Sequence, residues 1–216
     1  MRLAELCRTT GVTAPTVKWY LRTGLLHRGD ATAVNQASYD ESHVRRLRLI
    51  RALIEVGGLS TEAVSAVLGA LDDEDRTVQD VLAAAHDASA PQPSPPGQPA
   101  MERVEAFLRH RGWRVRPDSA ARRQLGAALC ALASLRDSTA PDVGSADAVA
   151  ALLDPYADAV ENLASAEIAN APDDLADELL IERVVAGTVI LEQAMAALRR
   201  MAQEHFARKR YGDTST

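Results

Sequence analysis

The fold of this chain is decided by residues 1–51, MRLAELCRTTGVTAPTVKWYLRTGLLHRGDATAVNQASYDESHVRRLRLIR. Leu3 and Leu6 recur at helical spacing, and Gly11 then interrupts the pattern with a residue that can adopt the positive φ of a tight turn. Thr13 is well placed to cap the helix that follows. The segment therefore predicts a helix, a tight turn, a second helix, a loop and a basic third helix.

The second helix is expected to begin near residue 14 and to stop at Gly24, because glycine commonly follows the last turn of a helix. Helical periodicity divides its side chains into an inward and an outward set. The inward set is Val17, Tyr20 and Leu21, and the outward set is Thr16, Lys18, Trp19 and Arg22. A short helix with Thr, Lys and Arg on its exposed side has the chemistry that a DNA major groove accepts.

A basic third helix is predicted after Asp40, whose carboxylate suits the N-cap position. An apolar stripe should be buried, and arginines flank it. The stripe is Val44, Leu47, Ile50, Leu53 and Ile54, and the arginines are Arg45, Arg46, Arg48 and Arg51. Two interpretations stay open: a solvated basic face, or a phosphate contact by Arg45 and also by Arg46. Gly57-Gly58 should close this helix, and Ser60 should open a short fourth one.

The run from Arg2 to Leu71 resembles the DNA-binding domain of the MerR family of bacterial transcription regulators. The sequence segments that carry the similarity are LAELCRTTGVTAPTVKWYLRTGLL, NQASYDESHVRRLRLI and RALIEVGGLS, in the family's order and spacing. The resemblance implies a winged-helix domain: the second helix enters the major groove, residues from about 26 to 39 form the wing, and two further helices brace it. The family commonly has an arginine where this chain has Ala37, so we expect a substitute contact from His27, Arg28 or Asn35.

The candidate DNA contacts follow from this resemblance and from the outward-facing residue types. The candidates for base edges are Thr13, Thr16 and Lys18. The candidates for the DNA backbone are Tyr20, Arg22, His27, Arg28, Tyr39 and Arg45, and Trp19 is expected to pack against the wing or the phosphates.

The net charge of −6 conceals an asymmetry along the chain. Residues 1–70 hold nine Lys/Arg against six Asp/Glu, a net of +3, whereas the remaining residues hold fifteen against twenty-four, a net of −9. Because neutralising phosphates supplies most non-specific affinity for DNA, a local basic field is sufficient for binding. The distribution indicates a nucleic-acid-binding head on an acidic body.

Composition divides the rest of the chain into further segments. Residues 72–90 are expected to form a connecting helix, and residues 91–99 a linker, because five prolines in nine residues prevent a helix. Residues 100–211 predict an all-α domain for dimerisation and effector binding, and 212–216 a tail. The helices expected in it span 101–111, 118–136, 146–170, where Pro155 could introduce a kink, and 173–208. The predicted fold class is therefore mostly α: a winged helix-turn-helix with a small β wing, and a C-terminal helical bundle.

The dimer helix that many MerR proteins have after the DNA-binding domain is cut short here by the prolines. The two-fold axis must then come from residues 78–88, from the C-terminal part, or from both. The last helix is apolar on more than one face, so it is expected to lie at the centre of a bundle or to form the seam of a dimer.

Several classes of function have no support in the sequence. Cys7 and Cys130 are the only cysteines, and the five histidines are scattered, so no metal and no cofactor are predicted. The phosphate-binding, zinc-protease and nucleophile motifs are missing, so the chain is not expected to be an enzyme. No run of 18 apolar residues or signal-like start is present, so a cytoplasmic protein without a membrane segment is expected.

The overall prediction is a one-component transcription regulator. A homodimer should bind double-stranded DNA at a pseudo-palindromic promoter site and distort it, acting on RNA polymerase as the family resemblance implies. A small-molecule effector is expected to bind near Phe107, Trp113, Tyr156 and Met195, where aromatic and adaptable side chains occur. The alternatives are a drug-sequestering protein with an idle head, a C-terminal domain used only for oligomerisation, and a polymerase partner that needs no operator.

Overall fold

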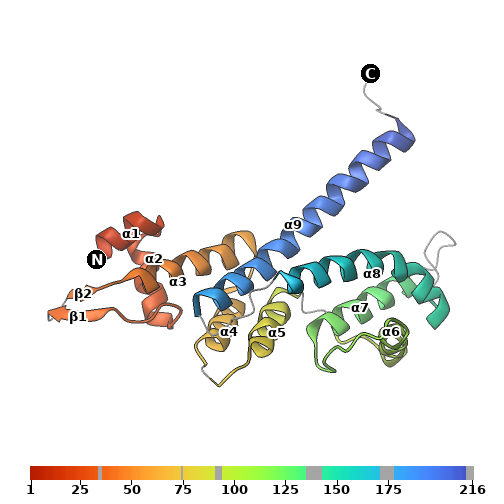
Figure 1. The fold of residues 1–216 in the computed structure, drawn as a ribbon, viewed down its shortest axis with the longest axis horizontal. Helices are drawn as coiled ribbons and strands as arrows, with labels where there is room; N and C mark the ends of the chain where they lie inside the picture. The colour runs from red at the N-terminus through yellow and green to blue at the C-terminus, as the bar shows by residue number, and fades with distance from the viewer. Residues whose placement is uncertain (34–35, 74, 91–93, 135–142, 171–177, 213–216) are drawn as a thin grey trace. The chain divides into compact units, whose positions relative to one another are not determined.

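The computed structural model describes residues 1–33, 36–73, 75–90, 94–134, 143–170 and 178–212. Helices dominate this part of the chain, and one two-stranded antiparallel sheet accompanies them (Figure 1). The chain forms two compact units, one from Met1–Ser89 with Ala176–Thr216 and the other from Ala90–Leu175. The mostly α fold with an N-terminal winged helix-turn-helix, as predicted from sequence, is confirmed. Within the described residues, no helix combines the length and the apolar character that crossing a membrane requires.

The first unit begins with the predicted helix-turn-helix. Helix α1 (Leu3–Thr10) ends at Gly11, whose φ of +70° allows its N–H to bond back to the Cys7 carbonyl. Helix α2 (Ala14–Thr23) has Thr13 as its N-cap and ends at Gly24, also at positive φ. The wing consists of β1 (Asp30–Ala33) and β2 (Gln36–Ser38), and it extends away from the helices (Figure 1).

The wing strands pair with Asp30 opposite Ser38 and Ala31 opposite Ala37, and the register then shifts before Ala33. Gly29 lies where the chain enters the wing, and an added Cβ there would collide with the Ser38 carbonyl and the Tyr39 ring. The close approach of the two backbones at the wing root therefore requires glycine.

The wing is followed by α3 (Glu41–Arg51), which runs directly into η1 (Ala52–Val56), one wide π-type turn. Helix α4 (Thr61–Leu71) is capped by Ser60 and packs against α5 (Val78–Ser89). The expected stripe is largely buried: Val44, Leu47, Ile50 and Leu53 are all fully inaccessible, and Ile54 packs against them. The predicted caps at Asp40 and Ser60 are confirmed.

Helix α9 (Glu178–Tyr211) belongs with this first unit, although the sequence placed it in a domain of residues 100–211. Val185 and Val189 are completely buried against η1 and α5. Gly57 makes the contact possible, because a Cβ there would collide with Val189 and the Leu53 carbonyl. The C-terminal half of α9 extends beyond the other elements of this unit (Figure 1).

The second unit contains α6 (Gln98–Arg111), α7 (Ala120–Ser134) and α8 (Ala146–Ala169). Its core is built from Val104, Phe107, Leu129 and Val149. Helix α6 starts three residues earlier than expected because Pro99 fits the first turn of a helix, and α8 continues through Pro155. The expected ends at 135–136 and 173–177 lie outside the described residues.

Candidate nucleic-acid interface

The polar face of α2 is the exposed face of the helix-turn-helix. Lys18 and Arg22 are exposed, and the Thr13 and Thr16 hydroxyls lie 2.8 Å apart at the start of the helix. The Thr13 oxygen also accepts the Thr16 N–H at 3.4 Å, which fixes the cap. Helix α2 therefore presents two hydroxyls at its start, Lys18 in its middle and Arg22 in its last turn, a set able to bond to base edges and phosphates.

Trp19 and Tyr20 are neighbours in sequence and have different environments. Trp19 is 36% exposed, whereas Tyr20 is 6% exposed and belongs to the core. Burial raises the pKa of the Tyr20 phenol, and Glu55 raises it further. Tyr20 therefore packs in the core while Trp19 is on the surface, and the predicted contact of Tyr20 with the DNA backbone stays a prediction.

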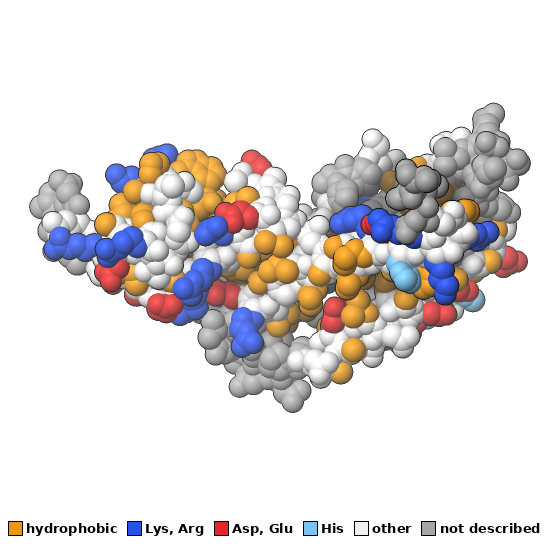
Figure 2. Space-filling model, turned by 90° about the horizontal axis from the view of Figure 1, so that it is seen from above, with side chains coloured by type: hydrophobic (Ala, Val, Ile, Leu, Met, Phe, Trp, Pro, Cys, Tyr) orange, Lys and Arg blue, Asp and Glu red, His pale blue; other side chains and the backbone are white. Residues whose placement is uncertain are grey.

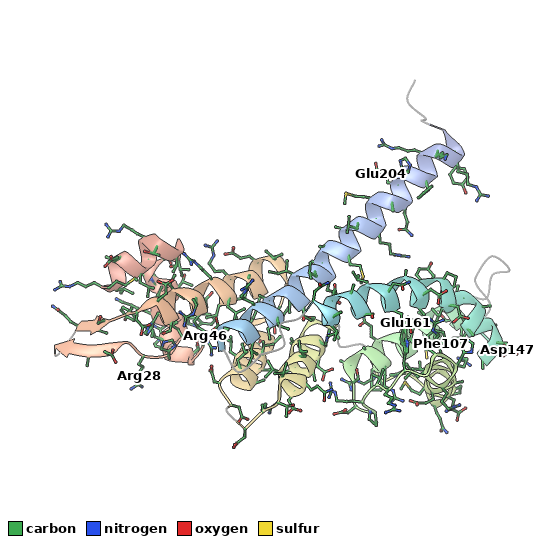
Figure 3. All side chains as sticks on the ribbon, viewed as in Figure 1. Arg28, Arg46, Phe107, Asp147, Glu161 and Glu204 are labelled. Atoms are coloured by element: carbon green, nitrogen blue, oxygen red, sulfur yellow. The ribbon has the colours of Figure 1, made fainter. Side chains whose placement is uncertain are left out.

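The wing root exposes two of the residues expected to replace the missing arginine. Leu25 and Leu26 are buried and fix the chain before the wing, and His27 and Arg28 are exposed directly after them. Arg28 points away from the helices of the unit (Figure 3). Asn35, the third proposed substitute, lies outside the described residues.

Tyr39 anchors the end of the wing and is 7% exposed. Its N–H donates to the Met1 carbonyl at 2.8 Å, and its carbonyl accepts from the amino terminus. Its ring meets His43 edge-on, with ring centroids 5.1 Å apart. Tyr39 therefore packs in the core as Tyr20 does, and its predicted DNA contact stays a prediction.

The arginines of α3 divide into structural and accessible residues. Arg46 is 7% exposed, and its guanidinium donates to the Leu25 carbonyl at 3.2 Å and pairs with Asp72 (Figure 3). Arg51 donates to the Thr10 carbonyl at 2.9 Å and to Glu55. Arg46 therefore has a structural role in this unit, since its donors bond to the Leu25 carbonyl before the wing and to Asp72 at the end of α4. Arg45 is half-buried and Arg48 is exposed.

Around the unit with the wing, Lys and Arg side chains project from the surface, as the left part of Figure 2 shows. The exposed cations of this unit include Lys18 and Arg22 on α2, Arg28 at the wing root and Arg48 on α3. Because these cations share one compact unit, their fields add over its surface. The basic character read from the sequence belongs to residues 1–70 of this unit, which carry a net charge of +3.

One group in the described residues has the chemistry of a metal site: His27, Asp40 and His43. The pKa of the Asp40 carboxyl is held far below its usual range, chiefly by the Ser42 hydroxyl and then by His43. Burial lowers the pKa of His27, and the neighbouring His43 lowers it further. Sequence reasoning treated these histidines as scattered, because only the fold of the wing brings His27 to the start of α3.

The residues expected to form an effector pocket are divided between the two units. Phe107 is buried in the second unit and meets Trp113 edge-on, with ring centroids 6.3 Å apart. Tyr156 is exposed on α8, whereas Met195 is on α9 of the first unit. Each unit therefore holds only part of the proposed set, and within the second unit Phe107 and Trp113 are in contact.

This geometry defines a winged helix-turn-helix DNA-binding protein, and comparisons with known proteins identify the family. The sequence model of the MerR HTH family of regulatory proteins matches residues 1–71. Over its full length, and over 100% of the other chain, the protein is similar to the crystal structure of SCO5550, a candidate transcriptional regulator from Streptomyces coelicolor A3(2), with 32% identity and a TM-score of 0.71. The chain belongs to the MerR family of DNA-binding transcriptional regulators.

Curated relatives match over shorter stretches. The nodulation protein NolA of Bradyrhizobium elkanii is 43% identical over 56 residues, which cover 26% of this chain and 26% of NolA. The HTH-type transcriptional regulator HmrR of Sinorhizobium medicae (strain WSM419) is 29% identical over 85 residues, 39% of this chain and 57% of HmrR. The chain thus spans from about a quarter to just over half of the length of these relatives.

Proposed function

We propose that this regulator binds a pseudo-palindromic promoter site as a homodimer, with α2 of each protomer in the major groove and the wing beside it. The observation that carries the proposal is the polar start of α2, with two threonine hydroxyls and Lys18, in the same compact unit as the exposed His27 and Arg28 of the wing root. Two heads related by a two-fold axis would read two half-sites, and the family resemblance supports distortion of the DNA between them.

The contact set is narrower than the sequence predicted. Base edges are assigned to Thr13, Thr16 and Lys18, and phosphates to Arg22, His27, Arg28 and Arg45, with Trp19 beside them. Tyr20 and Tyr39 are left out because they are buried. An interface of this kind separates residues that specify sequence from residues that position the protein.

Dimerisation is assigned to the C-terminal half of α9. This half carries a series of exposed apolar side chains, which are Leu191, Met195, Leu198, Met201 and Phe206. The competing segment, residues 78–88, already packs on α4 and α9 within the protomer and buries Val81 and Ala85 there. An exposed apolar helix face of this length is typical of a protein–protein interface.

Charge favours an antiparallel pairing of two α9 helices. The last turn carries Arg208, Lys209 and Arg210, whereas Glu192 lies near the start of the exposed half. A parallel pair would place the two basic ends together, and an antiparallel pair brings each basic end toward the partner's acidic segment. The same arrangement supplies the two-fold axis that a palindromic site requires.

A small-molecule effector and contact with RNA polymerase complete the proposal, and both rest on family resemblance. Within the second unit, the buried Phe107 and its neighbour Trp113 are the candidates for the effector, because aromatic side chains of this kind line small-molecule pockets. Tyr156 on α8 lies on the surface of the same unit.

The test of DNA binding is fluorescence anisotropy with the chain's own promoter fragment and with scrambled DNA of the same length, titrated in salt. We expect selective binding whose affinity falls as salt rises, because phosphate contacts release counterions. Equal affinity for both DNAs would reject the operator proposal and favour the sequestering alternative, which ligand binding to the full chain would then examine.

The test of the dimer is the mass in solution of the wild-type chain and of Leu198→Asp. We expect a dimer for the wild type and a monomer with unchanged helicity for the variant, because an aspartate would be buried in the α9 seam. The matched control is Arg199→Ala, next to it in sequence, which should stay dimeric. A dimeric Leu198→Asp protein would move the interface away from α9.

A further inference from the structure

Four polar side chains crowd together at the root of the wing. The candidate ligand atoms of His27, Asp40 and His43 all lie within 4.8 Å of one another. The Ser42 hydroxyl oxygen stands among them, 2.9 Å from His27 Nε2, 2.5 Å from Asp40 Oδ1 and 3.5 Å from His43 Nδ1. The imidazole of His43 also lies against that of His27, with ring centroids 3.9 Å apart.

The hydrogen bonds around His43 conflict with one another. The Asp40 N–H donates to Nδ1 at 3.2 Å, so Nδ1 presents a lone pair, yet Asp40 Oδ1 lies only 2.8 Å from the same nitrogen. The proton of the neutral ring is then on Nε2, which is buried and has no hydrogen-bond partner in the described part of the chain. Moving the proton to Nδ1 satisfies the carboxylate but turns that nitrogen into a donor facing the Asp40 N–H.

A cation shared by Nδ1 and the carboxylate removes the repulsion between two acceptors. The ion would coordinate the lone pair of His43 Nδ1, replacing the 3.2 Å hydrogen bond from the Asp40 N–H. The Ser42 hydroxyl, which now donates to Asp40, can turn away about its χ1 bond as the ion enters. The positive end of the α3 dipole disfavours a bound cation, and the carboxylates of Asp40 and Glu41 offset this effect.

The three ligands are held by different parts of the fold. His43 is 4% exposed and is fixed by the edge of Tyr39, whereas Asp40 is fixed as the N-cap of α3 through the Ser42 and His43 N–H groups. His27 follows the buried pair Leu25 and Leu26 and reaches the site from the other side of the wing. An ion here would therefore link the entry of the wing to the helix that follows it.

We propose that His27, Asp40 and His43 bind a divalent transition-metal ion of the zinc class. Two imidazoles and one carboxylate are ligands that Zn²⁺ accepts, and water can complete a four-coordinate site. Hard cations such as Mg²⁺ and Ca²⁺ prefer oxygen ligands and fit this set poorly. The sequence predicted no metal, because its five histidines are scattered along the chain and its two cysteines form no metal motif.

The first experiment measures Zn²⁺ binding to the full chain by isothermal titration at neutral pH, for the wild type, His27→Ala and His86→Ala. His86 is an exposed histidine on α5 and serves as the matched control. We expect one ion per chain in the wild type and in His86→Ala. His27→Ala should lose at least about 100-fold in affinity, because losing even an outer-shell partner of a metal costs about 10- to 100-fold.

Two further measurements distinguish loss of the metal site from unfolding of the chain and from metal binding by other residues. Asp40→Asn keeps an oxygen that can cap α3, and it should weaken Zn²⁺ binding while circular dichroism stays unchanged. Substitution with Co²⁺ should give the d–d absorption of nitrogen and oxygen ligands, lost in His27→Ala. Equal affinity in His27→Ala and the wild type, or a sulfur-to-cobalt charge-transfer band from Cys7 or Cys130, would overturn the site.

Discussion

Helices α2 and α3 both carry basic side chains, yet the fold uses them differently. On α2, Lys18 and Arg22 are exposed on a helix whose inward face is closed by Val17 and Tyr20. On α3, Arg46 is buried and donates to the backbone of another element. The difference shows that local charge density alone does not locate a DNA-binding surface.

The difference has a geometric cause. Six of the eleven residues of α3 are buried, compared with two of the ten residues of α2. Arg46 and Arg51 donate to the carbonyls of Leu25 and Thr10, which follow or end other helices. Helix α2 lies at the edge, with one face in the core. Arginine suits the first role because its fork can bond to a carbonyl and a carboxylate together.

The largest effect is expected from Arg46→Ala, which should lower the free energy of unfolding by about 2–3 kcal/mol. The substitution leaves the Leu25 carbonyl without this donor and removes a buried side-chain stem from the core. Urea unfolding followed by circular dichroism measures the change. The control is Asp72→Ala, which should cost less than about 1 kcal/mol because Asp72 is exposed. If Arg46→Ala kept the full stability of the wild type and lost DNA binding, Arg46 would be a DNA contact.

The second prediction concerns the exposed Lys18 and the half-buried Arg45. Lys18→Ala should weaken binding to the promoter fragment by about 1–3 kcal/mol, or roughly 5- to 150-fold, with unfolding and dimerisation unchanged. Arg45→Ala should weaken promoter and scrambled DNA alike and reduce the slope of log affinity against log salt by about 1, as expected for a phosphate contact. Unchanged affinity in both variants would reject the docking of α2 and α3 on DNA.

Much of the DNA-binding domain, residues 1–71, could be predicted because its structure depends on local sequence features. Thr13, Asp40 and Ser60 cap helices where the sequence placed them, and Gly11 and Gly24 end helices at positive φ. Each of these features depends on a few neighbouring residues, so one sequence is sufficient to recognise it. The same holds for the apolar stripe of α3, which is set by helical periodicity.

The features that sequence reasoning missed depend on distant partners. Tyr20 and Tyr39 each have an apolar ring and a polar hydroxyl. The sequence pattern alone therefore did not distinguish a core position from a phosphate contact. Val185 and Val189 mark α9 as apolar, but only the fold shows that their partners are Gly57 and α5. His27 likewise reaches Asp40 only through the wing between them.

A third and smaller effect is expected at Thr13. Its hydroxyl has a structural role as the N-cap of α2 and is also a candidate contact with a base edge. Thr13→Ala should lower the free energy of unfolding by about 1 kcal/mol, because the Thr16 N–H loses its cap. Thr13→Ser retains the hydroxyl and should keep the stability of the wild type. Thermal unfolding of both variants measures this. A base contact would appear as a loss of promoter affinity in Thr13→Ala larger than any loss of affinity for scrambled DNA.

The smallest effect is expected at Arg48, the exposed arginine of α3. Arg48→Ala should change the free energy of unfolding by less than about 0.5 kcal/mol, as is usual for surface substitutions away from buried features. It should also leave the salt slope of DNA binding unchanged, because a cation on a solvated face releases no counterions from DNA. Anisotropy across a salt series measures both affinity and slope. A flatter slope in Arg48→Ala would mean that the interface continues along α3, and the contrast between the two helices would then reduce to the buried Arg46 and to Arg51, which donates to the Thr10 carbonyl.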